Sequence, residues 1–321
     1  MEETNYLKNK IKQIPELPGI YKMLDAGNNI IYIGKSKCLK KRVASYFTSS
    51  NKWEKVARMV PMIKDIEFIV TDTHLDARLL ECKLIKDYQP RFNAQMKNDQ
   101  QYIFIKVEGY NQHRSISIVN EREADCFGPF RRSKYSMNEF LDRLKSFYPI
   151  AKMEDHYEFD FHLFPVTMDK ESFENNRTVL LELFSSSNNI QLLVEAFQEK
   201  LEEAVSVYRY EMASIYRDMI SGFNIIKHAL ERYHSLATRN FLLKHPVQDG
   251  YKLYYFISGQ LINSIIAPKL TTRMIKAFVN DTKIILKSHL ILPDNEKAQL
   301  DYQDIIYSEI SELQEEMVEL L

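Results

Sequence analysis

The stretch GIYKMLDAGNNIIYIG, residues 19–34, restricts the fold more than any other part of the sequence. Two short apolar runs flank the polar segment DAGNN, which is the pattern of a β-hairpin with a long connecting loop. Each run contains a tyrosine, Tyr21 in the first and Tyr32 in the second. Three of the eight glycines in the 321-residue chain also fall here: Gly19, Gly27 and Gly34.

The residues after this hairpin add further polar side chains to the same region. If Tyr21 lies opposite Tyr32, both hydroxyl groups emerge on one face, whereas a shift of one residue would send them to opposite faces. The next segment, CLKKRVASYF, has the apolar spacing of an amphipathic helix. Arg42 and Tyr46 are four residues apart and share one face of that helix. We therefore expect Lys35, which follows the hairpin, to meet Arg42 and the three phenols at a concave edge.

A strand over 66–70 and a helix over 74–88 are predicted next, with Pro90 ending the helix. This helix is apolar nearly all round, so Glu81 is expected to be partly buried. A buried carboxylate needs a charged partner or a metal ion. Two interpretations stay open at this point: Glu81 forms an ion pair with Arg78, or it binds a metal.

The net charge of −1 hides an asymmetry along the chain. Residues 1–107 contain 19 Lys and Arg against 12 Asp and Glu, and the remaining residues contain 24 against 32. Between Lys35 and Arg58 there are eight basic residues and one acidic residue. The basic first part favours a polyanionic partner such as nucleic acid. An ordinary solvated helix face rich in lysine is the alternative.

Several protein classes are disfavoured. No apolar run approaches the length of about 18 residues that spans a bilayer. The N-terminal MEETNYLKNK is too polar for a secretory signal. The three cysteines are far apart and odd in number, which argues against a disulfide framework or a cysteine-rich zinc site. We therefore expect a cytoplasmic protein without membrane association.

Five stretches together resemble the GIY-YIG nuclease domain of the UvrC family of excinucleases. They are PGIY at 18–21, IYIGKSKCLKKRVASYF at 31–47, EFIVTDT at 67–73, LLECKLIKDYQPRFN at 79–93 and KNDQQYIFIKV at 97–107. The resemblance covers residues 15 to about 107. It implies an active site of seven residues, all present in this chain: Tyr21, Tyr32, Lys35, Arg42, Tyr46, Glu81 and Asn93.

The resemblance implies hydrolysis of a phosphodiester bond in double-stranded DNA. Glu81 would hold one Mg²⁺ or Mn²⁺ ion. Tyr32 or Tyr21 would accept the proton of the attacking water, with Lys35 or Arg42 favouring the phenolate. The glycines are expected to let the DNA backbone approach. The basic residues expected to bind DNA are Lys35, Lys37, Lys40, Lys41 and Arg42.

Two later segments, CFGPF at 126–130 and FYPIAKMED at 147–155, resemble the part that follows the nuclease domain in this family. The family pattern continues there into a cysteine-rich iron–sulfur segment. This chain has Ala151 and Met153 in that region, and Cys126 is its last cysteine. We therefore expect no iron–sulfur cluster.

The segment LEEAVSVYRYEMASIYRDMI, residues 201–220, resembles the UVR motif, the helical hairpin through which UvrB and UvrC interact. It implies UvrB, working with UvrA, as a partner, or self-association through these helices. An amphipathic helix of any helical bundle could carry a similar pattern. The matching positions are Tyr210, Glu211, Ala213, Arg217, Asp218 and Ile220.

The sequence thus predicts an α/β protein built from four regions. They are a GIY-YIG nuclease domain with a small mixed sheet flanked by helices (1–107), a linker segment (108–168), a helical region with the UVR-like motif (169–235) and a small α/β region (236–321). The predicted function is a metal-dependent endonuclease that makes a single incision near damaged or distorted DNA in nucleotide excision repair, as a short Cho-type relative. The alternatives are a non-catalytic DNA- or UvrB-binding adaptor and a nuclease of the mobile-element type.

Overall fold

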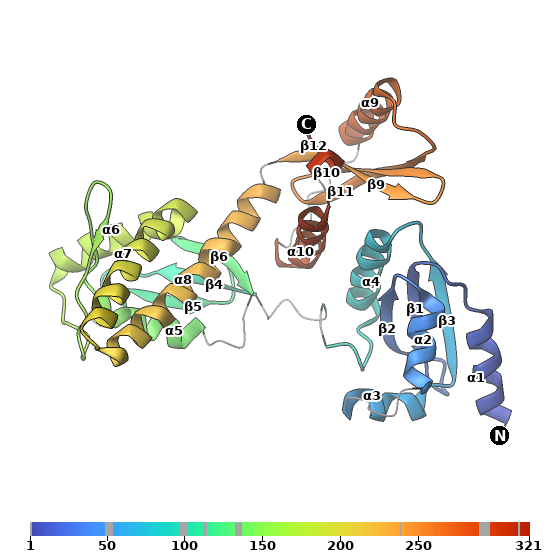
Figure 1. Cartoon of the computed structure of the whole chain (residues 1–321), viewed down its shortest axis with the longest axis horizontal. Coiled ribbons are helices and arrows are strands. Elements are labelled where there is room, and N and C mark those ends of the chain that lie inside the picture. Colours follow the sequence, from blue (N-terminus) through green and yellow to red (C-terminus); the bar gives the residue numbers. More distant parts are fainter. Residues whose placement is uncertain are drawn as a thin grey trace. The chain divides into compact units, whose positions relative to one another are not determined.

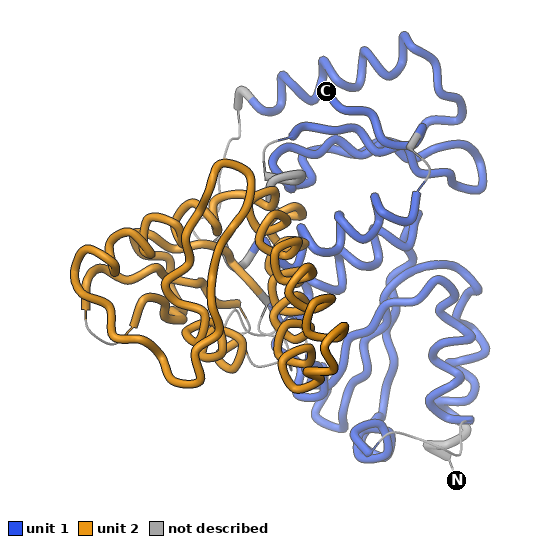
Figure 2. Tube along the Cα trace, turned by 60° about the vertical axis from the view of Figure 1, so that its left-hand side comes forward, with its two compact units in different colours: residues 1–99, 236–321 blue, residues 100–235 orange. Residues whose placement is uncertain are grey.

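The chain folds into two compact units (Figures 1 and 2). The first comprises residues 1–99 and 236–321, and the second comprises residues 100–235. The computed structural model describes residues 2–48, 54–94, 96, 102–111, 114–131, 137–237, 239–288, 296–313 and 315–321.

This division differs from the predicted domain boundaries in three places. Residues 102–107 are predicted from the sequence to belong to the nuclease domain, and in the structure they form a strand that pairs within the second unit. The linker and the helical region were predicted as separate parts, yet they share one hydrophobic core. Residues 236–321 were predicted as a separate region, yet they belong to the first unit.

The N-terminal part of the first unit is built on a three-stranded antiparallel sheet with the order β2-β1-β3. Its strands confirm the predicted hairpin and the predicted third strand: β1 (Gly19–Leu24), β2 (Ile30–Ser36) and β3 (Asp65–Val70). The helices of this part are α1 (Glu2–Gln13), α2 (Leu39–Thr48), α3 (Glu54–Met59), which continues into a 3₁₀ turn (Val60–Met62), and α4 (His74–Tyr88).

The hairpin register differs from the predicted one. Tyr21 lies opposite Gly34, and Tyr32 lies opposite Met23, so the expected pairing is wrong by two residues. The loop explains the offset, because the Asp25 carboxylate accepts hydrogen bonds from loop backbone N–H groups and the register shifts after Met23. An offset of two residues keeps side chains on the same face. Both tyrosines therefore still share one face of the sheet.

Helix α4 spans the predicted residues, and its sequence explains both ends. Thr73 caps the first turn in a capping box, in which its hydroxyl accepts the Asp76 N–H and the Asp76 carboxylate accepts the Thr73 N–H. The helix ends at Gln89, which adopts the left-handed conformation just before Pro90.

A second sheet forms the C-terminal part of the first unit, with the antiparallel order β11-β10-β9-β12. One face of this sheet packs against α4 and α10, and the opposite face packs against α9 (Figure 1). The elements are β9 (Asn240–Val247), β10 (Gly250–Ile257), β11 (Gln260–Ala267), α9 (Thr272–Ser288), α10 (Glu296–Glu312), a 3₁₀ turn (Glu315–Met317) and β12 (Val318–Leu320).

Polar contacts fasten α4, and the two residues just before it, to this C-terminal part. Arg78 and Glu309 form an ion pair of 3.0 Å, and the His245 imidazole lies 3.2 Å from the same carboxylate. Three further contacts flank that pair: Thr73 Oγ1 to Tyr254 Oη at 2.6 Å, Lys252 Nζ to Asp72 at 2.8 Å, and Lys86 Nζ to Asp301 at 2.8 Å. Together with the apolar contacts of Leu75 and Cys82, they make α4 the shared wall between the two sheets of the first unit.

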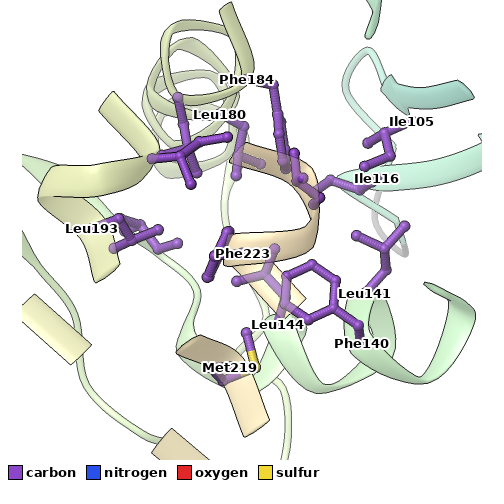
Figure 3. Packing of buried hydrophobic residues seen from close by; sticks show 14 of the residues in the cluster. Ile105, Ile116, Phe140, Leu141, Leu144, Leu180, Phe184, Leu193, Met219 and Phe223 are labelled. Carbon is purple, nitrogen blue, oxygen red and sulfur yellow. The ribbon is translucent and has the colours of Figure 1, made fainter. Parts of the chain in front are cut away.

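The second unit combines a three-stranded sheet, order β5-β4-β6, with helices that bury one continuous apolar cluster. Figure 3 shows Ile105 and Ile116 from the sheet facing Phe140 and Phe223 from two helices. The elements are β4 (Tyr102–Val107), β5 (Ile116–Val119), β6 (Cys126–Arg131), α5 (Met137–Leu144), a 3₁₀ turn (Lys145–Phe147), β7 (Ala151–Lys152), β8 (Tyr157–Glu158), α6 (Lys170–Ser185), α7 (Ser187–Ser206) and α8 (Tyr210–Ala237). Within the described part of the chain, none of the helices is long and apolar enough to cross a membrane.

Candidate active site

Three tyrosines from three different elements meet at the sheet face beside α2. Tyr21 on β1, Tyr32 on β2 and Tyr46 on α2 have ring centroids 5.9 to 6.1 Å apart. The hydroxyls of Tyr21 and Tyr46 are 2.8 Å apart, and Tyr46 Oη donates to Tyr32 Oη at 3.5 Å. Tyr21 is 1% exposed and Tyr46 is 6% exposed, whereas Tyr32 is half-buried. Tyr32 is therefore the phenol of the cluster that solvent or a substrate reaches most readily.

Gly34 makes this cluster possible. A Cβ atom at this position would lie 2.4 Å from Tyr21 Oη and 2.5 Å from Tyr21 Cζ. The ring of Tyr21 thus occupies the space that any other residue at position 34 would fill. Gly19 has a comparable role, because its Cβ would lie 2.2 Å from the backbone oxygen of Ile69. Two of the glycines expected to admit the DNA backbone thus accommodate other atoms of the protein.

The surroundings of the phenols favour their neutral forms. Burial, followed by the nearby Tyr32 and Tyr46, raises the pKa of Tyr21 well above its usual value. Burial, followed by Tyr46 and Glu81, likewise raises the pKa of Tyr32. Arg42 acts in the opposite direction on both groups, and its guanidinium carbon lies 5.0 Å from the centroid of the Tyr46 ring. Of the two cations expected to favour a phenolate, Arg42 is thus the one beside the phenols.

Lys35 is instead the partner of Glu81. The Glu81 side chain is buried, with 7% of the residue exposed. Its Oε1 accepts the backbone N–H of Lys35 at 3.1 Å, and its Oε2 accepts Lys35 Nζ at 2.6 Å. Arg78 contacts Glu309 and Ser308 on α10. The interpretation of Glu81 as the ion-pair partner of Arg78 is therefore wrong, because the face of α4 that carries Arg78 packs against the C-terminal part.

Asn93 lies on the backbone of β2. Its Oδ1 accepts the N–H of Ile33 at 2.9 Å, and its Nδ2 donates to the carbonyl of Ile33 at 2.8 Å. The preceding Phe92 N–H donates to the Ile31 carbonyl at 2.9 Å. Asn93 thus holds the segment after α4 along the outer edge of β2. Its contacts indicate a positioning role rather than direct participation in chemistry.

The basic residues expected to bind DNA differ in their exposure and in their acidic partners. Lys37, Lys41 and Arg42 are exposed, and Lys35 is half-buried against Glu81. Lys40 Nζ lies 3.8 Å from a Glu16 oxygen. Exposed cations are thus present beside the tyrosine cluster, as a phosphate-binding surface requires.

Glu81 is the side chain best suited to hold a divalent cation here. The described residues contain no group of three or more His, Cys, Asp or Glu side chains arranged to bind a metal. Mg²⁺ does not need one, because it keeps several water ligands and is commonly held by one or two carboxylates. A buried carboxylate at the rim of the phenol cluster fits that requirement. One carboxylate together with water molecules is a set of ligands that suits a single divalent cation such as Mg²⁺.

The UVR-like positions lie in the second unit, where α7 and α8 form a helical hairpin. Tyr210, Glu211 and Arg217 are exposed. Ala213 is buried, and Ile220 packs against the core. Asp218 forms an ion pair with Arg143 on α5 at 2.9 Å, so its main partner belongs to the same unit.

Sequence reasoning missed two features of the site: the Lys35–Glu81 pair and the contact of Gly34 with Tyr21. The two members of the pair are 46 residues apart, so no local spacing indicates their contact. The glycine contact depends on the hairpin register. The concentration of glycines in residues 19–34 was the available signal for a close approach.

Comparisons with known proteins show what this chain is similar to. Residues 17–94 match the family model described as a UvrC-like GIY-YIG domain. The chain carries a UvrC-like GIY-YIG domain. It is also 33% identical to the UvrABC system protein C of Clostridioides difficile over 234 residues and 32% identical to that of Acetivibrio thermocellus over 249 residues.

These alignments cover 67% and 72% of this chain but 38% and 39% of the two relatives. The matched part of the chain thus spans less than two fifths of the length of these UvrC proteins. Among solved structures, it resembles the GIY-YIG N-terminal endonuclease domain of UvrC from Thermotoga maritima bound to magnesium. That match has 38% identity, covers 28% of this chain and 97% of that domain, and has a TM-score of 0.26.

The role of Gly34 is testable. We expect Gly34→Ala to displace Tyr21, because the added methyl group would occupy the position of its ring, and to cost about 1–3 kcal/mol of stability as an overpacked site. Thermal unfolding of the purified protein measures the loss. Gly109→Ala is the matched control, because a Cβ there meets no atom within 4 Å. Equal melting temperatures for Gly34→Ala and the unsubstituted protein would contradict this reading.

Proposed function

We propose that the chain is a metal-dependent DNA endonuclease of the UvrC-like GIY-YIG type. The observation that supports this proposal most directly is the placement of Tyr32, the half-buried phenol, near both Arg42 and the buried Glu81. A base, a cation for the phosphate and a metal-binding carboxylate are the groups that phosphodiester hydrolysis requires. The GIY-YIG domain is the endonuclease domain in the solved UvrC relatives.

The proposed role of Tyr32 is to act as a phenolate, formed by release of its own proton to solvent and favoured by Arg42, and to accept a proton from the attacking water at its Oη atom. Tyr21 is too deeply buried for that role and instead orients Tyr46 through the 2.8 Å contact of their hydroxyls. Tyr46 in turn donates to Tyr32 and leaves the second lone pair of Tyr32 Oη for the water. Arg42 stabilises the charge that develops on the phosphate oxygens, with a planar fork of donors that lysine lacks.

A divalent cation would be held by Glu81 and water. When bound, it would polarise the phosphate and stabilise the leaving 3′ oxygen, and its charge would offset that of Glu81, one of the groups that raise the pKa of Tyr32. Lys35 remains beside the carboxylate and fixes its orientation through both the backbone N–H and Nζ. Mg²⁺ and Mn²⁺ both suit these ligands.

The cellular role that we propose is a single incision in damaged or distorted double-stranded DNA during nucleotide excision repair in the cytoplasm. The likeness to the UvrABC system protein C of two bacteria, which extends beyond the nuclease domain, supports a repair role. We propose one incision because the site described above supplies one constellation of active-site residues. A single-lesion duplex, cut with and without UvrA and UvrB, tests this role.

Replacing the metal-binding carboxylate tests the chemistry. Glu81→Gln retains the shape of the side chain but removes the charge that holds the cation. We expect the nicking rate in Mg²⁺ or Mn²⁺ to fall about a thousandfold or more, equivalent to several kcal/mol of transition-state stabilisation. DNA affinity should change little, because the exposed basic residues carry it. Nicking rate, DNA affinity and Mn²⁺ binding are measured together.

Glu309→Gln is the matched control for that substitution. Glu309 is also a buried carboxylate in contact with α4, but its partners are Arg78 and His245. We expect the control to lower the melting temperature and leave the nicking rate of the folded protein within about threefold, a factor worth less than 1 kcal/mol. A well-folded Glu81→Gln protein that nicks DNA at the unsubstituted rate would refute the proposed mechanism.

The roles of the tyrosines can be separated in the same nicking assay. We expect Tyr32→Phe to lower the rate about a hundredfold or more, the usual effect of removing a general base. Tyr21→Phe removes an orienting hydrogen bond, which is worth about 1 kcal/mol or roughly fivefold in rate. Tyr88→Phe is the control, since Tyr88 is exposed at the end of α4. A larger loss for Tyr21→Phe than for Tyr32→Phe would reverse the assignment.

We also propose that UvrB binds the turn of the α7–α8 hairpin. The two tyrosines of this turn are the most exposed aromatic residues there, Tyr208 at 76% and Tyr210 at 63%, and their rings contact each other. Exposed aromatic residues are typical of protein interfaces. Of the UVR-like positions, Tyr210, Glu211 and Arg217 remain in this proposal. Ala213, Asp218 and Ile220 support the hairpin from within the unit.

The double substitution Tyr208→Ser with Tyr210→Ser should weaken UvrB binding at least tenfold, because loss of one aromatic anchor commonly costs more than 1 kcal/mol. Val166→Ser is the control for general loss of exposed apolar surface in the same unit. Calorimetry and size-exclusion chromatography measure UvrB binding and self-association. Unchanged binding and oligomeric state in the double variant would remove the hairpin turn from the partner surface.

A further inference from the structure

Charge is divided within the C-terminal part of the first unit. Residues 240–288 contain seven Lys and Arg against two Asp and Glu, whereas residues 289–321 contain one against nine. Two acidic residues of α10 have partners on α4, in the Arg78–Glu309 and Lys86–Asp301 pairs. Much of the positive charge instead lies in α9 and the segment before it, across the sheet from α10 (Figure 1).

The rotation of α9 about its own axis is fixed by its contacts with the sheet. Phe278 and Thr282 are buried on the inner face of the helix. The Thr282 hydroxyl donates to the Phe278 carbonyl at 2.8 Å and accepts a hydrogen bond from Asn263 Nδ2 on β11 at 3.0 Å. The residues on the opposite face of α9 therefore point away from the sheet.

Four basic residues form what we call the α9 basic face: Lys269, Arg273, Lys276 and Lys283. All four are exposed. Successive residues of a helix are rotated by about 100° around its axis, so Arg273, Lys276 and Lys283 lie within an arc of about 80°. Asp281 lies outside this arc, about 80° from Arg273 in the opposite direction. None of the four forms a hydrogen bond or ion pair with another described residue, whereas Lys244 and Lys252 nearby pair with Glu319 and Asp72.

We propose that the α9 basic face is a second contact surface for double-stranded DNA, separate from the catalytic edge. This inference rests on the proposed endonuclease function. Arg273 and Lys283 are separated by about 15 Å along the helix, which is the length of about four phosphates on one strand. Clustered cations without acidic partners repel one another, and a phosphate backbone relieves that repulsion. Phosphate contacts carry no sequence information, so this face adds affinity for any duplex.

DNA binding across a salt series tests this surface in the full chain. The measurement uses an undamaged duplex of about 30 base pairs in EDTA, so that no cutting occurs. We expect the variant with Lys269, Arg273, Lys276 and Lys283 all changed to Gln to bind more weakly. Its slope of log affinity against log salt should be shallower by about 2–3, since each lost phosphate contact removes about 0.9. Arg114→Gln with Lys170→Gln, two exposed cations of the second unit, should leave the slope unchanged.

The outcomes separate this proposal from the endonuclease itself. If the unsubstituted protein binds DNA and the four-residue variant has the same slope, the α9 basic face is not a DNA contact, and the nuclease proposal stands. If the unsubstituted protein does not bind DNA, both proposals fail. Vesicles containing phosphatidylserine form a further arm, because Ile284 is exposed beside the same face. Binding to vesicles but not to DNA through these four residues would assign the face to a membrane surface instead.

Discussion

The arrangement of the first unit depends on helix α4, which has buried charges on two of its faces. Glu81 is fixed by Lys35 on one side, and Arg78 and Lys86 are fixed by α10 on another. Removing one member of a buried pair leaves an uncompensated charge, which costs far more than an exposed pair contributes. The helix is therefore held in a single rotation. The rotation of the helix that carries Glu81 is thus set in part by Glu309 and Asp301, residues far away in the sequence.

The tyrosine cluster shows how packing and chemistry constrain each other. Close packing of three rings requires a residue without a side chain at position 34, and it buries two of the hydroxyls. Burial stabilises the neutral phenol, so the cluster by itself opposes formation of a phenolate. Arg42 is the cation that counteracts this effect. The one half-buried ring, that of Tyr32, combines access to solvent with hydrogen bonding to a buried neighbour.

Features that depend on local patterns could be predicted from the sequence, and features that depend on distant partners could not. The hairpin, the span of α4 and the shared face of Tyr21 and Tyr32 follow from alternation, a capping box and a period of two. The observed hairpin register differs from a direct pairing of Tyr21 with Tyr32, because the loop that begins at Asp25 sets the register. The predicted pairing of Arg78 with Glu81 was wrong, because the observed partner of Arg78 is Glu309, which lies 231 residues away in the sequence. The structure divides the chain before residues 102–107 rather than after them, because the apolar alternation of these residues does not reveal which sheet the strand joins.

The order of the two units along the chain has a consequence for synthesis. The first unit is interrupted by the whole of the second, so the apolar side of α4 that carries Leu75 and Cys82 is made long before its cover on α10. At translation rates of about 5–20 residues per second, roughly 10–45 seconds separate the two segments on the ribosome. During that interval the second unit can fold alone, while the nascent nuclease domain exposes an uncovered helix. Completion of the catalytic unit is thus tied to a segment that is made only after the whole of the second unit.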